Sequence, residues 1–323
     1  MTLPPATAEY AVMESAAVRV LVITGQTASG KEGAALAAAE RLGGEIISLD
    51  SMKVYRGLDI GTAKASAADR RRAPHHLLDV VNPWEKFSAA RWAELAEAAL
   101  GEIRGRGRVA IVSGGTVLYL KALLYGLFDG PAADPALRAG LEAEAERLGV
   151  TSLHARLATV DPAAAARIHP NDLRRIVRAL EVQQLTGRPI SQLQGQFGNL
   201  RPGLSPVLVA LRRGREDLVR RIDERVERML AAGFEDEVRG LLAAPGGLSM
   251  EAAQAVGYRE MIALLEGRLP REELAAEIKK NTRRFAKQQM THLRSLKECT
   301  WLDVAEGESA EAVAARVVEA WNG

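Results

Sequence analysis

The sequence predicts an α/β protein whose core is a parallel sheet with helices on both faces. Three observations predict it. Apolar, β-branched runs alternate with stretches of helical periodicity over residues 18–124, which is typical of βαβ units. The first apolar run, 18–24, leads into a glycine-rich turn and an alanine-rich helix. A further apolar run at 206–211 resumes the pattern after a stretch in which we expect helices only.

The glycine-rich turn at residues 25–31 carries the most specific chemical signal. Its sequence GQTASGK matches seven of the eight positions of the G-x-x-x-x-G-K-[ST] loop, whose backbone N–H groups and lysine hold phosphate. The following helix N-terminus adds a partial positive charge. We therefore expect a P-loop NTPase-like sheet and a site for a phosphate ester. The loop residues are Gly25, Gln26, Thr27, Ala28, Ser29, Gly30, Lys31 and Glu32.

Glu32 stands where this motif has a serine or threonine that would bind Mg²⁺. A carboxylate close to a diphosphate repels it unless a metal ion lies between them. Two interpretations stay open. Glu32 either coordinates the metal directly or turns outward as an acidic residue that suits the first turn of a helix.

The next elements follow in order. We expect strands at 45–49, 75–81 and 108–113, a functional loop at 50–64, and helices at 87–104 and from 116 to 124. Lys31, Asp50 and Thr116 each follow a predicted strand, and ligands of parallel sheets bind at the carboxyl ends of strands. We therefore expect one crevice that contains all three residues. An acid at the position of Asp50 can hold Mg²⁺ through water or accept a proton from a nucleophile.

The chain changes character near residue 130. Residues 130–201 read as a helical insertion domain with proline at its boundaries, and the chain is mainly helical from 216 to its end. The predicted organisation is a flexible N-terminus at 1–17, a P-loop core domain of 18–129 and 202–323, and the insertion between them.

Composition narrows the class of protein further. A net charge of +2 does not by itself indicate a nucleic-acid partner, and the lone Cys299 is compatible with a reducing cytoplasm. No apolar run is long enough for a membrane span, and residues 1–17 do not resemble a signal peptide. We therefore expect a cytoplasmic protein without a membrane partner.

Basic residues cluster in two places. Residues 278–297 contain seven lysines and arginines and no acidic residue, which favours binding to a polyanion over an ordinary solvated helix face. Arg174, Arg175 and Arg178 form a second patch, spaced for one helix face in the insertion. A third group around Arg221 also contains acidic residues, so an intrahelical ion-pair network is equally compatible there.

Read in order, these motifs resemble the tRNA dimethylallyltransferase family, the adenosine-37 isopentenyltransferases. The segments that carry the resemblance are GQTASGK at 25–31, DSMKVYRGLDIGTAK at 50–64, HHLLDV at 75–80, GGTVLYLKALLYGL at 114–127, DPAAAARIHPNDLRRIVRALEV at 161–182, RIDERVERMLAAGF at 221–234, QAVGYREM at 254–261 and NTRRFAKQQMTHLRSL at 281–296. The family usually carries Pro at Gln26, Ser or Thr at Glu32 and Gly at Val117, and the departure at Glu32 puts the usual metal ligation in doubt.

The resemblance implies transfer of a dimethylallyl group from dimethylallyl diphosphate to N6 of adenosine 37 in the anticodon stem-loop, with Mg²⁺ as cofactor. It implies that Asp50, at the position of the family's catalytic acid, hydrogen-bonds the amine and removes its proton, with Thr27 and Lys31 acting on the diphosphate and Arg221 as a second diphosphate ligand. The candidate metal ligands, Glu32 and Asp50, come from the residues themselves. The resemblance also implies tRNA contacts, to which we add the basic helix: Asp50, Ser51, Met52, Lys53, Thr116, Arg138, Arg174, Arg175, Ile176, Val177, Arg178, Arg283, Arg284 and Lys287. Nothing in the sequence requires more than a monomer.

Two other functions explain part of the sequence. A small-molecule or nucleoside kinase would use the same loop, metal and acid, but it leaves the basic helix and the insertion without a role. A tRNA-binding adaptor without catalysis would follow if Glu32 abolished metal binding.

Overall fold

The computed structural model describes residues 17–128, 130–194 and 199–323, so the predicted N-terminal extension lies almost entirely outside the described residues. The chain divides into two compact units. The core unit contains the chain up to Leu124 together with Arg201–Gly323, and the helical unit contains Tyr125–Leu200.

A parallel sheet forms the centre of the core unit. Within the described residues its strand order is β3-β2-β4-β1-β5-β6, and every neighbouring pair is parallel. The strands are β1 (Val18–Gly25), β2 (Glu45–Leu49), β3 (His75–His76), β4 (Ala110–Gly114), β5 (Leu204–Arg213) and β6 (Thr300–Val304). The central strands are almost continuously apolar because helices cover both of their faces. The predicted fold class is confirmed.

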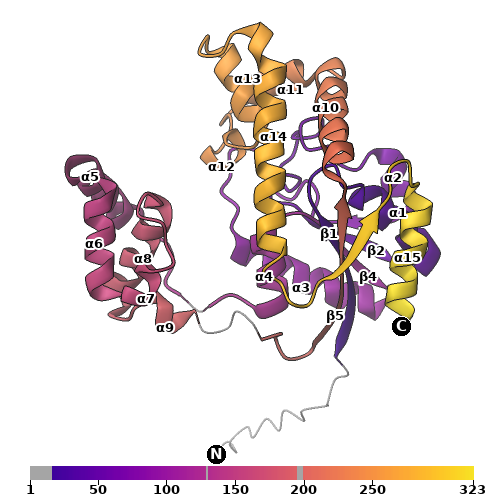
Figure 1. The fold of residues 1–323 in the computed structure, drawn as a ribbon, viewed down its shortest axis with the longest axis horizontal. Coiled ribbons are helices and arrows are strands. Elements are labelled where there is room, and N and C mark those ends of the chain that lie inside the picture. The colour runs from indigo at the N-terminus through magenta and orange to yellow at the C-terminus, as the bar shows by residue number, and fades with distance from the viewer. Residues whose placement is uncertain (1–16, 129, 195–198) are drawn as a thin grey trace, which may run out of the picture. The chain divides into compact units, whose positions relative to one another are not determined.

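Helices lie on both faces of this sheet (Figure 1). On one face, α1 (Lys31–Leu42) packs against α15 (Ala310–Asn322), and their alanine and valine side chains form one apolar cluster with the strands. On the other face lie α3 (Ala89–Gly105) and α4 (Val117–Tyr125). Trp92 of α3 joins them to the sheet, because its ring stacks on Tyr119 of α4 and its Nε1 donates to the carbonyl of Ser48.

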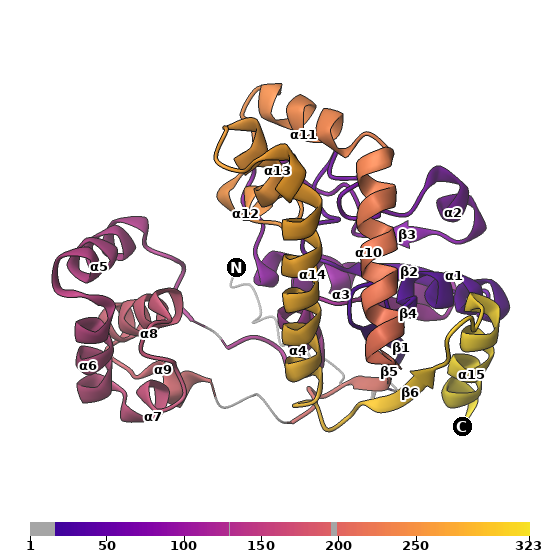
Figure 2. The same ribbon diagram turned by 45° about the horizontal axis from the view of Figure 1, so that its top comes forward.

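Two long helices, α10 (Arg215–Ala231) and α14 (Arg271–Leu293), run side by side in the core unit (Figures 1 and 2). Both reach the carboxyl ends of the central strands, since Arg221 and Gln289 contact the loop that follows β1. The remaining helices of this unit are α2 (Ala67–Arg72), α11 (Phe234–Ala243), α12 (Met250–Ala253) and α13 (Tyr258–Leu265).

The helical unit has an apolar core of its own. Its helices are α5 (Pro135–Leu148), α6 (Val150–Val160), α7 (Pro162–Ala165), α8 (Leu173–Thr186) and α9 (Ile190–Leu193). Asp134, Asp161 and Asp172 cap three of them, each accepting hydrogen bonds from the first turn. Leu153 and Leu180 are fully buried between the helices.

The structure differs from the expected elements in two places. The predicted strand at 75–81 ends after His76, because Leu77 and Asp79 adopt left-handed backbone angles (φ 61° and 55°) that no strand tolerates. Strand β6 was not expected, since the chain was predicted to be mainly helical from 216 onward. Its five residues pair with the end of β5, a partner far away in the sequence.

None of the helices in the described part of the chain combines the length and the apolar character that crossing a membrane requires.

Candidate functional site

The phosphate loop connects β1 to α1 and depends on two glycines. A side chain at Gly25 would lie 2.8 Å from the carbonyl oxygen of Leu211, and Gly30 has a φ of 93° that favours glycine. Because Gly30 has no side chain, it cannot cap α1. Among the described residues, the amides of Ala28 and Gly30 find no acceptor. These N–H groups form a concave donor site that suits an anion.

Lys31 supplies a full positive charge to this loop. The residue is buried, and its Nζ donates to the carbonyl of Gln26 at 3.2 Å. Burial lowers the pKa of Lys31, although the neighbouring Glu32 carboxylate opposes that shift. A bound anion would stabilise the ammonium form, so the loop is prepared for phosphate.

Arginines from the end of β5 and from α10 also contact the loop. Arg213 Nε donates to the carbonyl of Ser29 at 2.8 Å, and Arg221 Nε donates to that of Ala28 at 2.9 Å. Arg225 Nη1 lies 3.4 Å from Thr27 Oγ1. Burial, followed by the charge of Arg213, lowers the pKa of Arg221, so a nearby anion is favoured here as well. Sequence analysis missed Arg213 and placed Arg225 only in the mixed-charge group around Arg221; the position of Arg213 at a strand's carboxyl end was a usable signal.

Glu32 does not take the outward-turned position that is one of its two expected roles. Its Oε1 lies 3.5 Å from Lys31 Nζ and 3.3 Å from Lys53 Nζ, while the side chain remains 46% exposed. Burial disfavours the carboxylate, but the charges of Lys31 and Lys53 outweigh burial and lower the pKa of Glu32. The carboxylate therefore faces the two lysines and does not simply turn outward. Lys53 itself is buried, so this carboxylate lies between two buried ammonium groups.

Asp50 lies at the end of β2 and organises the following turn. Its Oδ1 accepts hydrogen bonds from the amides of Met52 at 2.8 Å and Lys53 at 3.3 Å. Thr116, after β4, accepts at Oγ1 from the amide of Ser51 at 3.0 Å and donates its own N–H to Leu49. The two strand ends are thus joined directly.

A cleft of about 390 Å³ brings these segments together. The sequence-predicted residues that line it are Thr27, Lys31, Glu32, Asp50, Ser51, Met52 and Thr116. The expected crevice at the carboxyl ends of β1, β2 and β4 is therefore present, with the phosphate loop and Asp50 on the same walls.

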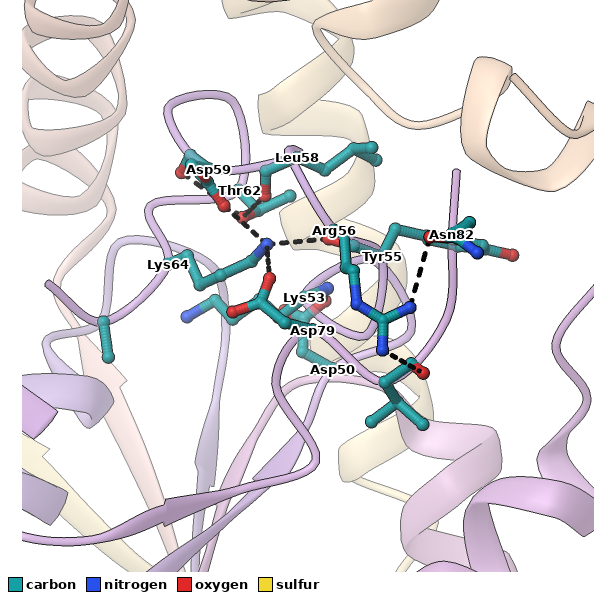
Figure 3. Close-up of polar contacts among 12 residues, drawn as sticks. Asp50, Lys53, Tyr55, Arg56, Leu58, Asp59, Thr62, Lys64, Asp79 and Asn82 are labelled. Carbon is teal, nitrogen blue, oxygen red and sulfur yellow. Dashed lines mark hydrogen bonds and ion pairs between the residues drawn. The ribbon is translucent and has the colours of Figure 1, made fainter. Parts of the chain in front are cut away.

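The loop that carries Asp50 is held by a buried ammonium group (Figure 3). Lys64 Nζ donates to the carbonyl of Tyr55 and to the carboxylates of Asp59 and Asp79, at 2.6–2.7 Å. On the same loop Arg56 donates to Asn82 Oδ1 and to the carbonyl of Val80. A buried, fully paired ammonium such as that of Lys64 fixes one loop conformation, and the exposed Arg56 adds a second link between the same segments.

The basic stretch 278–297 is less one-sided in space than in sequence. Arg283 forms an ion pair with Asp223 at 2.6 Å, and Lys279 pairs with Glu227; both acids lie on α10. Arg284 and Lys287 are exposed and form no ion pair with any described residue. Within α14 (Arg271–Leu293) these two are therefore the described lysines and arginines without an ion pair, and Arg294, just beyond the helix, is exposed as well.

The predicted contacts in the helical unit divide into exposed and buried groups. Arg174 and Arg175 are exposed, whereas Arg138 and Arg178 both bind the buried carboxylate of Glu181. Ile176 and Val177 belong to the apolar core of this unit. The prediction that placed these two with the tRNA contacts is wrong for their side chains, because they point into the core.

The residues present fit a divalent cation only if a ligand completes its coordination. No group of three or more His, Cys, Asp or Glu side chains in the described part of the chain is arranged to hold a metal. Glu32 and Asp50 share the cleft and supply two carboxylates. Mg²⁺ commonly takes one or two carboxylates and fills its remaining positions with water and phosphate oxygens, so the pair suits it.

Comparisons with known proteins agree with this geometry. A sequence model of the IPP transferase family matches residues 53–296. The chain belongs to the IPP transferase family. It is 48% identical over 290 residues to the tRNA dimethylallyltransferase of Geobacter metallireducens, covering 90% of this chain and 94% of the relative. It is 49% identical over 302 residues to that of Anaeromyxobacter sp. (strain K), covering 94% and 98%.

Solved structures give the same result. This IPP transferase matches the tRNA isopentenylpyrophosphate transferase of Bacillus halodurans with a TM-score of 0.68 and 36% identity, covering 94% of this chain and 97% of the other. It matches a eukaryotic dimethylallyltransferase acting on tRNA with a TM-score of 0.77 and 27% identity, covering 93% and 77%. The resemblance stated from the motifs is confirmed, and the family favours prenyl transfer over the kinase alternative.

Proposed function

We propose that this IPP transferase moves a dimethylallyl group from dimethylallyl diphosphate to N6 of adenosine 37 in the anticodon stem-loop of tRNA. The observation that carries the proposal is the cleft in which the phosphate loop and Asp50 lie together. The tRNA dimethylallyltransferase relatives support both the prenyl donor and the tRNA acceptor. The lone Cys299 and a tRNA substrate support action in the cytoplasm, and we propose a monomer.

The leaving group accounts for the positive charge of the loop. In an allylic diphosphate the bond between C1 and the diphosphate oxygen breaks, and its electron pair stays on the diphosphate. Lys31, Arg221 and the hydroxyl of Thr27 would bind the oxygens that gain this charge, together with the free loop amides. Donors fixed before the reaction stabilise such charge without reorganising.

The acceptor needs a base. N6 of adenine forms its bond to C1 while one of its N–H bonds breaks, and Asp50 would take that proton. Backbone amides of the described residues engage Oδ1 of Asp50 and not Oδ2, so Oδ2 would be available to the amine. Because adenine must leave its stack to reach the cleft, an unpaired loop base is the substrate with the smallest free-energy cost of unstacking.

Mg²⁺ would be held by Glu32 and, through water, by Asp50. When bound, it would neutralise part of the negative charge of the diphosphate. Lys31 and Lys53 neutralise the same carboxylate of Glu32 in its absence.

For tRNA, we propose contacts from the turn at 50–53 and Thr116 in the core unit, from Arg283, Arg284 and Lys287 on α14, and from Arg138, Arg174, Arg175 and Arg178 in the helical unit. The exposed Arg174, Arg284 and Lys287 would contribute most, since ion pairs already engage Arg138, Arg175, Arg178 and Arg283.

A donor assay tests the whole proposal. The protein is incubated with unmodified tRNA, Mg²⁺, labelled dimethylallyl diphosphate and ATP, and both donors are followed. We expect the label to enter tRNA at adenosine 37 while ATP remains intact. Consumption of ATP without prenyl transfer would establish a kinase, and consumption of neither donor would leave a tRNA-binding adaptor.

A second experiment tests the metal role of Glu32. We expect Glu32→Thr to shift the Mg²⁺ concentration that gives half-maximal rate, because one anionic metal ligand is replaced by a neutral one. The control is Glu40→Thr, an exposed acid further along α1 that pairs with Arg72. An unchanged Mg²⁺ dependence in Glu32→Thr would rule out direct ligation.

A further inference from the structure

Gln289 of α14 is a buried polar residue that the proposed reaction does not use. Its carboxamide makes two hydrogen bonds. Oε1 accepts from the backbone N–H of Thr27 at 2.8 Å, and Nε2 donates to the carbonyl of Gly115 at 3.0 Å. One partner belongs to the phosphate loop and the other to the turn after β4. A single amide therefore joins α14 to both segments that line the diphosphate end of the cleft.

The surroundings of this amide are built to admit it. A Cβ at Gly115 would lie 2.4 Å from Nε2 of Gln289, so only glycine leaves room for the contact. One turn earlier on the same helix, the carbonyl of Ala286 accepts a hydrogen bond of 2.9 Å from Gln26 Nε2. Proline, which the family usually carries at Gln26, could not make this second link. The phosphate loop is thus hydrogen-bonded to α14 at two positions that lie one helical turn apart.

The same helix carries the unpaired basic residues. Arg284 and Lys287 lie five and two positions before Gln289, on one continuous helix, and both are exposed. A polyanion bound at these residues restrains the element that holds the Thr27 amide. Helix α14 therefore links the place where a polyanion would bind to the hydrogen bond that holds the phosphate loop.

We propose that Gln289 is a positioning residue that couples tRNA binding on α14 to diphosphate binding in the phosphate loop. This inference rests on the proposed function, which assigns RNA to the basic residues of α14. RNA that restrains α14 lowers the remaining cost of ordering the loop, so diphosphate binds more tightly. By linkage, diphosphate must tighten RNA binding by the same factor.

The test uses the full chain, inorganic pyrophosphate and an unmodified anticodon stem-loop RNA in calorimetric titrations at constant Mg²⁺. In the wild type, we expect saturating RNA to lower the Kd of pyrophosphate by about fivefold or more. In Gln289→Leu we expect that ratio to fall below about twofold, while the affinity for RNA alone is retained. Thr291→Val, an exposed position on the same helix, should keep the wild-type ratio.

Two further variants separate coupling from folding, which melting temperatures and circular dichroism monitor. Gly115→Ala should displace the amide and abolish the coupling, and adding Gln289→Leu to it should cause no further loss. Gln289→Glu keeps the acceptor for Thr27 but places an oxygen against the Gly115 carbonyl, so it should weaken coupling in a folded protein.

Three results would overturn the inference. They are a wild type without coupling, a folded Gln289→Leu variant with full coupling, and losses that add in the Gly115→Ala, Gln289→Leu double variant. Failure of the proposed function has a different signature, because labelled dimethylallyl diphosphate would then stay unconsumed while pyrophosphate and RNA still bind.

Discussion

Clusters of arginine lie both at the phosphate loop and in the helical unit, but the two clusters differ in the acceptors that the guanidinium groups contact. In the helical unit, Arg138 and Arg178 share the carboxylate of Glu181, which is fully buried. At the loop, Arg213 pairs with the buried carboxylate of Asp217, but Arg221 donates to a carbonyl oxygen and Arg225 to a hydroxyl, neither of which carries a charge. Arginines that share a carboxylate stabilise the fold, whereas Arg221 and Arg225, which face neutral acceptors, keep their positive charge for a ligand.

The largest effect on the reaction rate is expected at Asp50, which lies in the cleft beside the phosphate loop. Replacing Asp50 with asparagine removes the proposed base, and we expect the rate at saturating substrates to fall about 10²- to 10⁴-fold. Single-turnover prenylation assays, quenched at successive times, measure this rate. The control is Asp134→Asn in the helical unit, where asparagine also caps a helix, and this variant should keep its rate. A variant of Asp50 that loses tRNA affinity but keeps the saturated rate would make Asp50 a binding residue only.

The next effect concerns stability. Burial alone would raise the pKa of Glu181, but hydrogen bonds from Arg138 and Arg178 outweigh it and lower the pKa from 4.5 to about 2. The ionised carboxyl therefore contributes about 3 kcal/mol to folding above pH 4.5, and this contribution is lost as the pH falls toward 2. We expect Glu181→Gln to unfold at lower urea concentration at pH 7, with a gap to wild type that narrows in acid. A gap independent of pH would contradict this explanation.

A smaller effect is expected at the loop. Arg221→Gln should weaken pyrophosphate binding about tenfold, the scale of one charge-assisted hydrogen bond. Calorimetry measures it. Arg212→Gln is the matched control, because Arg212 lies near the end of β5, just before α10, but pairs with Asp303 on the surface. Equal losses in both variants would mean that general surface charge, rather than the position of Arg221, holds the diphosphate.

The smallest expected effect is on the salt dependence of tRNA binding, which should distinguish ion-paired from unpaired basic residues of α14. Neutralising Arg284 or Lys287 should each reduce the slope of log affinity for tRNA against log salt by about 0.7–0.9. Arg283→Gln should change this slope less, because Asp223 already neutralises Arg283. Fluorescence titrations over a range of salt concentrations measure the slopes. A slope that responds only to Arg283 would reverse the assignment.

The sequence predicted features that depend on neighbours along the chain. The phosphate loop, the strand before Asp50 and the helix expected at 87–104 all have local signals, and the structure contains each of them. Features that depend on distant partners were missed. Strand β6 exists because β5 offers it an edge, and Gln289 reaches the loop only because α14 packs against it. The carboxylates of Asp223 and Glu227 reach the basic helix from α10, which no run of residues along α14 could reveal.

The chain leaves the core unit after Leu124 and returns to it at Arg201, whose amide donates to the carbonyl of Leu124 at 2.8 Å. The two chain segments that lead into and out of the helical unit are therefore joined to each other inside the core unit. A short turn spliced between these two residues would leave the sheet and its cleft with their connections intact, so the intervening helices form a cassette that can be shortened, exchanged or removed without rethreading the protein.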